Sequence, residues 1–193
     1  MSGSYLGDAG IFLIRTLFGL YIFAVMLRFL LQTARADFYN PICQVLVKVT
    51  NPPLLPLRRV VPGVLGVDMA ALLLLLLLKT LELLLIQQMS GFSGDIVGLV
   101  VLGAAQLLKL LLDLYFFSIL IQVILSWVNS GASHNPAVSL LYSLNEPLMR
   151  PARRLLPQMS GLDLSPLLVI IALQLLTMLV VMPLNDFALR LLA

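Results

Sequence analysis

The sequence predicts an all-α membrane protein with four transmembrane helices, arranged as two parallel two-helix hairpin repeats. Three observations predict it. The 193-residue chain is 61% hydrophobic and 11% charged, with a mean hydropathy of +1.06, whereas soluble domains carry about 25% charged residues. Four apolar segments are each long enough to cross a bilayer, which takes about 20 residues. The polar segment between the first two spans recurs between the last two, 95 residues later and without a gap.

The spans follow from the lengths of the apolar runs, and we predict them at residues 9–32, 69–88, 104–128 and 164–184. The third run extends from Ile96 to Val128 and exceeds one span, so it must tilt or begin with an interfacial piece near residues 98–103. The N-terminal stretch has Asp8 where a signal peptide has basic residues, so we expect it to remain as the first span.

Loop charges predict the orientation of these spans. The connection at residues 33–67 contains four basic residues and the one at residues 129–162 contains three, whereas the link at residues 89–95 contains none. By the positive-inside rule, both long connections are cytoplasmic. Residues 1–95 and 96–193 then run in the same sense, so the two halves are parallel repeats.

The repeated segment combines helix-starting residues, prolines and paired arginines. Its ten identical positions are Asn40, Pro41, Leu46, Pro52, Pro56, Arg58, Arg59, Pro62, Gly66 and Asp68, matched by Asn135, Pro136, Leu141, Pro147, Pro151, Arg153, Arg154, Pro157, Gly161 and Asp163. Each Asn-Pro pair favours a helix start, and apolar residues follow at helical spacing. We therefore predict a short amphipathic helix in each loop, ended by the next proline. The glycine then gives a turn, and the aspartate caps the returning span.

The paired arginines are the first candidates for a binding function. Arg58, Arg59, Arg153 and Arg154 lie among apolar residues, which suits a segment at headgroup depth where guanidinium groups meet phosphates. They would then bind anionic lipid phosphates or an acidic membrane partner. The alternative is that they only anchor the topology, as cytoplasmic arginines beside spans generally do.

Charged residues inside the spans are the second candidates, because charge is costly in a bilayer. They are Arg15, Lys79, Glu82, Lys109 and Asp113. The spacing allows Lys79 to meet Glu82 and Lys109 to meet Asp113 on their own helices. We also expect Arg15 to pair with Glu82 or Asp113 and tie the halves together. Mutual neutralisation is the preferred interpretation over a conduction path, because none of these charges recurs 95 residues away.

The sequence contains no pattern that predicts catalysis. It has none of the common phosphate-loop, hydrolase or metalloprotease motifs. Cys43 and His134 are the single cysteine and histidine, which excludes an intrachain disulfide and a cysteine-based metal site. The few basic residues do not form a nucleic-acid-binding surface. We therefore expect no catalytic, cofactor-binding or metal site and no nucleic-acid partner.

The repeated segment resembles the YggT family, also called YlmG, of small bacterial and plastid membrane proteins. The resemblance rests on the motif from Asn40 to Asp68 and its copy from Asn135 to Asp163, so it covers nearly the whole chain. The second copy departs at Arg150, where the first has Leu55. The resemblance implies a multi-pass protein of the bacterial cytoplasmic membrane without enzymatic activity. It further implies a link to osmotic stress tolerance or cell division, and in plastids to cytochrome assembly and nucleoid organisation.

The resulting hypothesis is a non-enzymatic accessory or assembly protein whose two loops engage lipid headgroups or a membrane partner, including another copy of the chain. The alternative is a small transporter or channel subunit involved in the osmotic response.

Overall fold

The computed structural model describes residues 2–64, 66–91, 94–128, 135–155 and 163–192. These residues form a helical bundle in which four long apolar helices could each cross a membrane. The long helices are α1 (Ser2–Thr33), α3 (Met69–Ser90), α4 (Ile96–Val128) and a last one in three parts. Those parts are α6 (Ser165–Leu176), the π-helical turn η2 (Thr177–Val181) and α7 (Met182–Leu192). The predicted all-α class with four helices long and apolar enough to span a membrane is confirmed.

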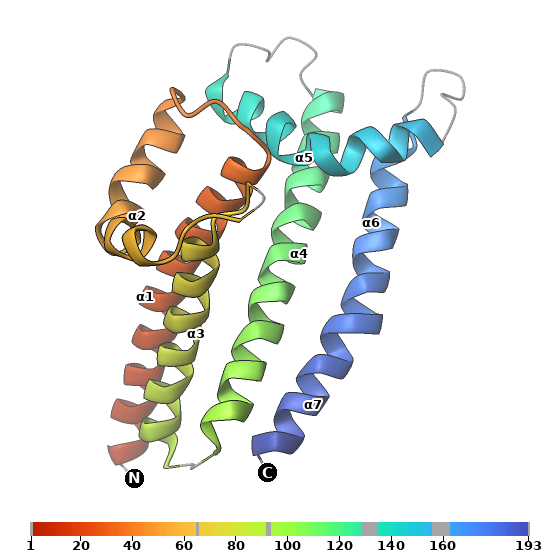
Figure 1. Cartoon of the computed structure of the whole chain (residues 1–193). Helices are drawn as coiled ribbons and strands as arrows, with labels where there is room; N and C mark the ends of the chain where they lie inside the picture. The colour runs from red at the N-terminus through yellow and green to blue at the C-terminus, as the bar shows by residue number, and fades with distance from the viewer. Residues whose placement is uncertain (1, 65, 92–93, 129–134, 156–162, 193) are drawn as a thin grey trace.

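The helices are arranged so that two shorter ones lie at one end of the bundle (Figure 1). These are α2 (Pro41–Val60), beside α1 and α3, and α5 (Pro136–Leu155), across α4 and α6. Both termini lie at the opposite end, together with the end of α3 and the start of α4. Within the halves, α1 packs on α3 and α4 packs on the last helix, and α3 and α4 join the halves.

The third apolar run forms one continuous helix, so the alternative of an interfacial piece at residues 98–103 is wrong. The glycines there allow close helix packing instead. A Cβ atom at Gly98 would lie 2.8 Å from the Leu192 side chain, whereas one at Gly103 would make an ordinary contact, 3.5 Å from Thr80 Oγ1. Small residues serve this purpose commonly in membrane helices, where backbones pack closely.

The prediction that prolines end the amphipathic helices is also wrong. Pro52, Pro53 and Pro56 lie inside α2, and Pro147 and Pro151 lie inside α5. A proline inside a helix leaves the carbonyl four residues earlier without its N–H donor. For Pro53 that carbonyl belongs to Val49, and it accepts a hydrogen bond of 3.3 Å from the Tyr21 hydroxyl of α1. Packing against the spans therefore compensates for a backbone bond that the helix itself cannot make.

Each amphipathic helix is fastened to the span before it by a buried polar residue at the same repeat position. In α2, Thr50 Oγ1 accepts a hydrogen bond of 2.6 Å from Arg28 Nη1 of α1. In α5, Asn145 accepts one from the Ser118 hydroxyl and donates one of 2.7 Å to Gln122 Oε1, both on α4. Thr50 and Asn145 are each 0% exposed. The two loops thus use one position and different chemistry for the same attachment.

We predict that Asn145→Ala lowers the free energy of unfolding by about 1–3 kcal/mol, because it removes two buried hydrogen bonds and leaves the buried Gln122 Oε1 without its donor. Thermal unfolding of the purified protein in detergent measures the effect. Ser139→Ala is the matched control, since Ser139 lies on the exposed side of α5. Equal melting temperatures for the two variants would contradict the prediction.

Candidate functional site

The first arginine of each pair is bonded within its own repeat. Arg58 donates to the Asp68 carboxylate from Nε at 3.0 Å and from Nη2, and Nη2 also donates to Gln32 Oε1 at 3.1 Å. Arg153 donates from Nε to Asp163 at 3.2 Å and from Nη1 to Glu146 at 3.4 Å. The Arg58–Asp68 pair therefore recurs as Arg153–Asp163, and each pair joins the end of an amphipathic helix to the start of the returning span.

The same aspartates also act at the starts of the returning spans. Asp68 is the N-cap of α3 and accepts a hydrogen bond of 3.2 Å from the Ala71 amide. Asp163 accepts one of 2.9 Å from the Ser165 amide, although the N-cap residue of α6 is Leu164. Partial burial raises the pKa of Asp163, but hydrogen bonds from Ser165 and Arg153 outweigh it, and the pKa lies below its ordinary value of 3.8.

The second arginine of each pair is available to solvent. Arg59 and Arg154 are both exposed, and neither takes part in an ion pair within the described part of the chain. The four arginines, which sequence reasoning treated alike, thus fall into two kinds. Arg58 and Arg153 hold the loops to the bundle, and Arg59 and Arg154 face outward.

The structure describes the repeated prolines and glycine fully in the first copy of the repeated segment and only in part in the second. Pro56 and Pro151 lie within α2 and α5, and Pro62 follows α2. Gly66 has a φ of 83°, which favours glycine, in a turn where Val64 and Val67 bond each other's backbones at 3.1 and 2.9 Å. Pro157 and Gly161, as well as His134, lie outside the described residues.

The asparagines of the two helix starts hold the repeats together. Asn40 is the N-cap of α2, where its side chain accepts from the Ile42 amide at 3.0 Å. Asn135 accepts in the same way from the Ala137 amide at 2.9 Å. Asn40 Nδ2 also donates to the Pro136 carbonyl at 2.8 Å, so one motif bonds its own copy. Both Asn-Pro motifs are recognisable in the sequence, but nothing in the sequence indicates that one bonds the other.

Four of the five charged residues in the spans form the two ion pairs that their spacing predicts. Lys79 Nζ lies 2.8 Å from Glu82 Oε2, and Lys109 Nζ lies 2.6 Å from Asp113 Oδ2. The expected pairing of Arg15 with Glu82 or Asp113 is wrong, because both carboxylates bind a lysine on their own helix. Arg15 is exposed on α1.

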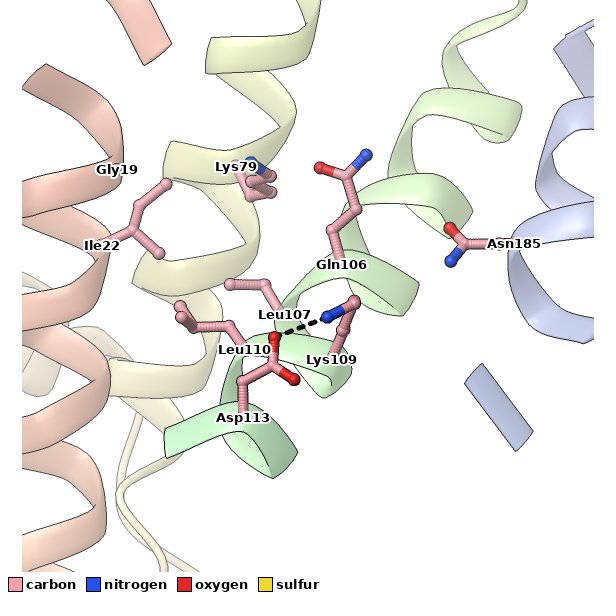
Figure 2. A pocket seen from close by; sticks show the side chains of 9 residues that line it. All are labelled: Gly19, Ile22, Lys79, Gln106, Leu107, Lys109, Leu110, Asp113 and Asn185. Carbon is pink, nitrogen blue, oxygen red and sulfur yellow. Dashed lines mark hydrogen bonds and ion pairs between the residues drawn. The ribbon is translucent and has the colours of Figure 1, made fainter. Parts of the chain in front are cut away.

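These charges border a hollow of about 490 Å³ where the two halves meet (Figure 2). Its polar lining consists of Lys79, the Lys109–Asp113 pair and the amides of Gln106 and Asn185, and Gly19 and Ile22 of α1 close one side. Glu82 is buried and is not part of this lining. The amides of Gln106 and Asn185 make no hydrogen bond to other described residues and were missed by sequence reasoning.

Other polar residues were missed because sequence reasoning weighed only formal charge in mid-span. Arg28 is 5% exposed near the end of α1, and Gln122 and Ser118 are buried in α4. A signal for them existed at Thr50 and Asn145, which are polar residues at matching repeat positions. Among the described residues, no group of three or more histidine, cysteine, aspartate or glutamate side chains could hold a metal ion.

Comparisons with known proteins agree on one family. The family model described as CCB3/YggT matches residues 8–89 and again residues 101–184. An uncharacterized protein of Pseudomonas aeruginosa is 44% identical over 178 residues, covering 91% of this chain and 90% of that protein. An uncharacterized protein of Vibrio alginolyticus is 46% identical, covering 84% and 88%, and the uncharacterized protein YggT of Escherichia coli K12 is 39% identical, covering 86% of each. No solved structure matches the chain.

We predict that neutralising the two repeated aspartates has unequal effects. Asp68→Asn should lower the free energy of unfolding by about 3 kcal/mol, because the Asp68 side chain is 6% exposed and its loss leaves a half-buried guanidinium without its counter-charge. Asp163→Asn should cost at most about 1 kcal/mol, because Asp163 and Arg153 are 41% and 40% exposed. Thermal unfolding in detergent compares the two, and equal losses would show that the pairs are energetically equivalent.

Proposed function

The chain belongs to the CCB3/YggT family, and from this premise we propose that it is a non-enzymatic accessory or assembly protein of a bacterial cytoplasmic membrane. Its working surface would be formed by α2 and α5, which engage lipid headgroups or a membrane partner. The resemblance to the family adds a link to osmotic stress tolerance or cell division.

The observation that carries this proposal is the position of the exposed arginines. Arg59 and Arg154 lie at matching places near the ends of two amphipathic helices, and both helices lie at the same end of the bundle (Figure 1). Arg58 and Arg153 hold these helix ends against the returning spans. Two exposed cations at matching places on one end of the bundle favour binding of phosphate or carboxylate groups over a role in topology alone.

The orientation follows the charge of the loops. The end that bears α2 and α5 holds most of the basic residues, so we place it on the cytoplasmic side, with both termini outside. The cytoplasmic leaflet carries the anionic surface that attracts such cations, and each one near the surface contributes about 1 kcal/mol.

We predict that Arg59→Ala together with Arg154→Ala reduces copurification of a membrane partner about thirtyfold, because two surface cations at about 1 kcal/mol each together correspond to roughly 1.5 decades in affinity. The readout is the amount of partner retained by the tagged full chain from detergent-solubilised membranes. Lys48→Ala together with Arg150→Ala is the matched control, because both are exposed cations on the same helices outside the repeated arginine pairs. If both double variants retained the partner equally, Arg59 and Arg154 would not form the surface that binds it.

A transporter or channel subunit is the second candidate, and the hollow beside Lys79 and Lys109 favours it. Polar groups that line a cavity in a membrane domain commonly mark a solute or ion path. The charges in it are largely neutralised in pairs, however, and the lining does not recur in the other half of the chain. A pore built by duplication would be expected to repeat its lining residues.

For the preferred function we predict that the purified chain in liposomes gives no ion flux above protein-free liposomes, measured with an ion-sensitive dye. Glu82→Gln and Asp113→Asn provide the decisive variants, and Asp95→Asn, an exposed carboxylate outside the spans, provides their control. Flux in the unmodified protein that disappears in Glu82→Gln and Asp113→Asn, but not in the control, would establish transport instead.

A further inference from the structure

The second repeat contains a hollow of about 650 Å³ between α4, α5 and α6 that has charged and aromatic groups at one end and an apolar wall at the other. Arg153 and Asp163 supply the charges, and Trp127 and Tyr142 supply the aromatic rings. We propose that this hollow binds one molecule of a zwitterionic phospholipid, with a phosphate and an ammonium group in its headgroup. This inference deepens the proposed function and rests on it, because it places α5 at headgroup depth.

At the corresponding place in the first repeat, the polar side chains bond one another. There, a smaller hollow of about 350 Å³ is lined by Gln32, Arg58 and Asp68. Arg58 is bonded to both other residues, and Asp68 is nearly buried. In the second repeat Trp127 occupies the position of Gln32, and an indole has no acceptor to offer an arginine. The second site therefore lacks the acceptor that Gln32 offers to Arg58 in the first.

The open site leaves the arginine with a free donor. Arg153 uses Nε for Asp163 and Nη1 for Glu146, while its Nη2 has no acceptor among the described residues. Both contacts are long, at 3.2 and 3.4 Å, and the Arg153 side chain is 40% exposed. A phosphate oxygen can accept from Nη2 without breaking either contact, and such charge-assisted bonds are among the strongest polar contacts.

The charges of both signs decide which headgroup fits. Asp163 is 41% exposed beside Arg153, and the Glu146 side chain is 42% exposed on the other side of it. Arg150 also bonds Glu146, so Asp163 is the carboxylate that a phosphate at this place would face. An ammonium group in the same headgroup balances Asp163, and the exposed rings of Trp127 and Tyr142 attract cations over their faces.

The apolar wall suits the lipid chains. Leu120 and Val123 of α4 and Leu164, Leu167 and Ile170 of α6 form it, and Leu120, Leu164 and Leu167 are exposed. From Trp127 to Leu120 the hollow follows α4 for about 10 Å, at 1.5 Å per residue. It therefore begins at the headgroup layer and continues into the hydrocarbon, as an acyl chain does.

The experiment is a lipid competition read by native mass spectrometry. The delipidated full chain is mixed with equal amounts of phosphatidylethanolamine and phosphatidylglycerol, and the lipid that stays bound is identified. We expect one phosphatidylethanolamine per chain in preference to phosphatidylglycerol. Arg153→Gln should lower its retention about tenfold, because one charge-assisted bond is lost. Arg154→Gln, the same change at the neighbouring arginine, which does not line the hollow, should leave retention unchanged.

Further arms separate the lipid from its parts and from misfolding. Leu167→Trp fills the apolar wall without altering any charge and should also release the lipid, so the test does not depend on the folding of Arg153→Gln. Glycerophosphoethanolamine and inorganic phosphate should fail to displace the lipid, because they lack chains. Preferential retention of phosphatidylglycerol, equal loss in Arg154→Gln, or retention by both Arg153→Gln and Leu167→Trp would overturn the proposal.

The outcome is separable from the test of the proposed function. Arg59 and Arg154 do not line the hollow, so their substitution should leave the bound lipid in place. Loss of the partner with the lipid retained would support both ideas. If the lipid is retained and the substitutions of Arg59 and Arg154 change the binding of no partner, the lipid site is supported and the accessory function through these arginines is contradicted.

Discussion

The link between an arginine at the end of an amphipathic helix and an aspartate at the start of the returning span determines how each hairpin closes. Arg58 with Asp68, and Arg153 with Asp163, join two helices that are separated by a short connection. The same carboxylates accept backbone amides at the starts of α3 and α6. One side chain thus ends the loop and begins the span, which explains physically why these residues recur at an unchanged spacing.

Much of the fold could be predicted because the bilayer restricts it. In a bilayer, an apolar run as long as that from Met69 to Ser90 must form a helix, because only a helix satisfies all its backbone hydrogen bonds internally. A helix start such as Asn40-Pro41 depends only on neighbouring residues, so it can also be predicted from the sequence. The course of α2 through Pro52 and Pro53 could not be predicted, because it depends on Tyr21 from another helix. Lys79 met Glu82 as predicted, since both lie on one helix, whereas the partner of Arg15 required tertiary information.

The candidate site was predictable only as a set of residue types. All four arginines were candidates from the sequence. Which arginine of each pair is bonded and which is exposed could not be predicted, because this depends on which one reaches the aspartate of the returning span. Sequence reasoning marked Arg150, in place of Leu55, as the departure of the second loop from the first, but did not weigh the exchange of Gln32 for Trp127. That exchange removes the acceptor that Gln32 offers to Arg58 in the first repeat, and the hollow beside Arg153 in the second repeat is larger. Duplication here has preserved the attachment of the loop and altered the space around it.

The π-helical turn at Thr177–Val181 has a consequence for the last helix. A π turn accommodates one extra residue, which rotates everything after it by about 100° relative to a regular helix. Before the turn the buried side follows Ser165, Val169 and Leu173, and after it that side passes through Val181 and Ala188. In an uninterrupted helix the inward position would fall to Leu184 rather than Asn185, and the hollow between the repeats would gain an isobutyl group where it now has an amide. Helical phase, set in a turn that ends four residues before Asn185, therefore decides whether the last helix contributes an amide or an isobutyl group to that space.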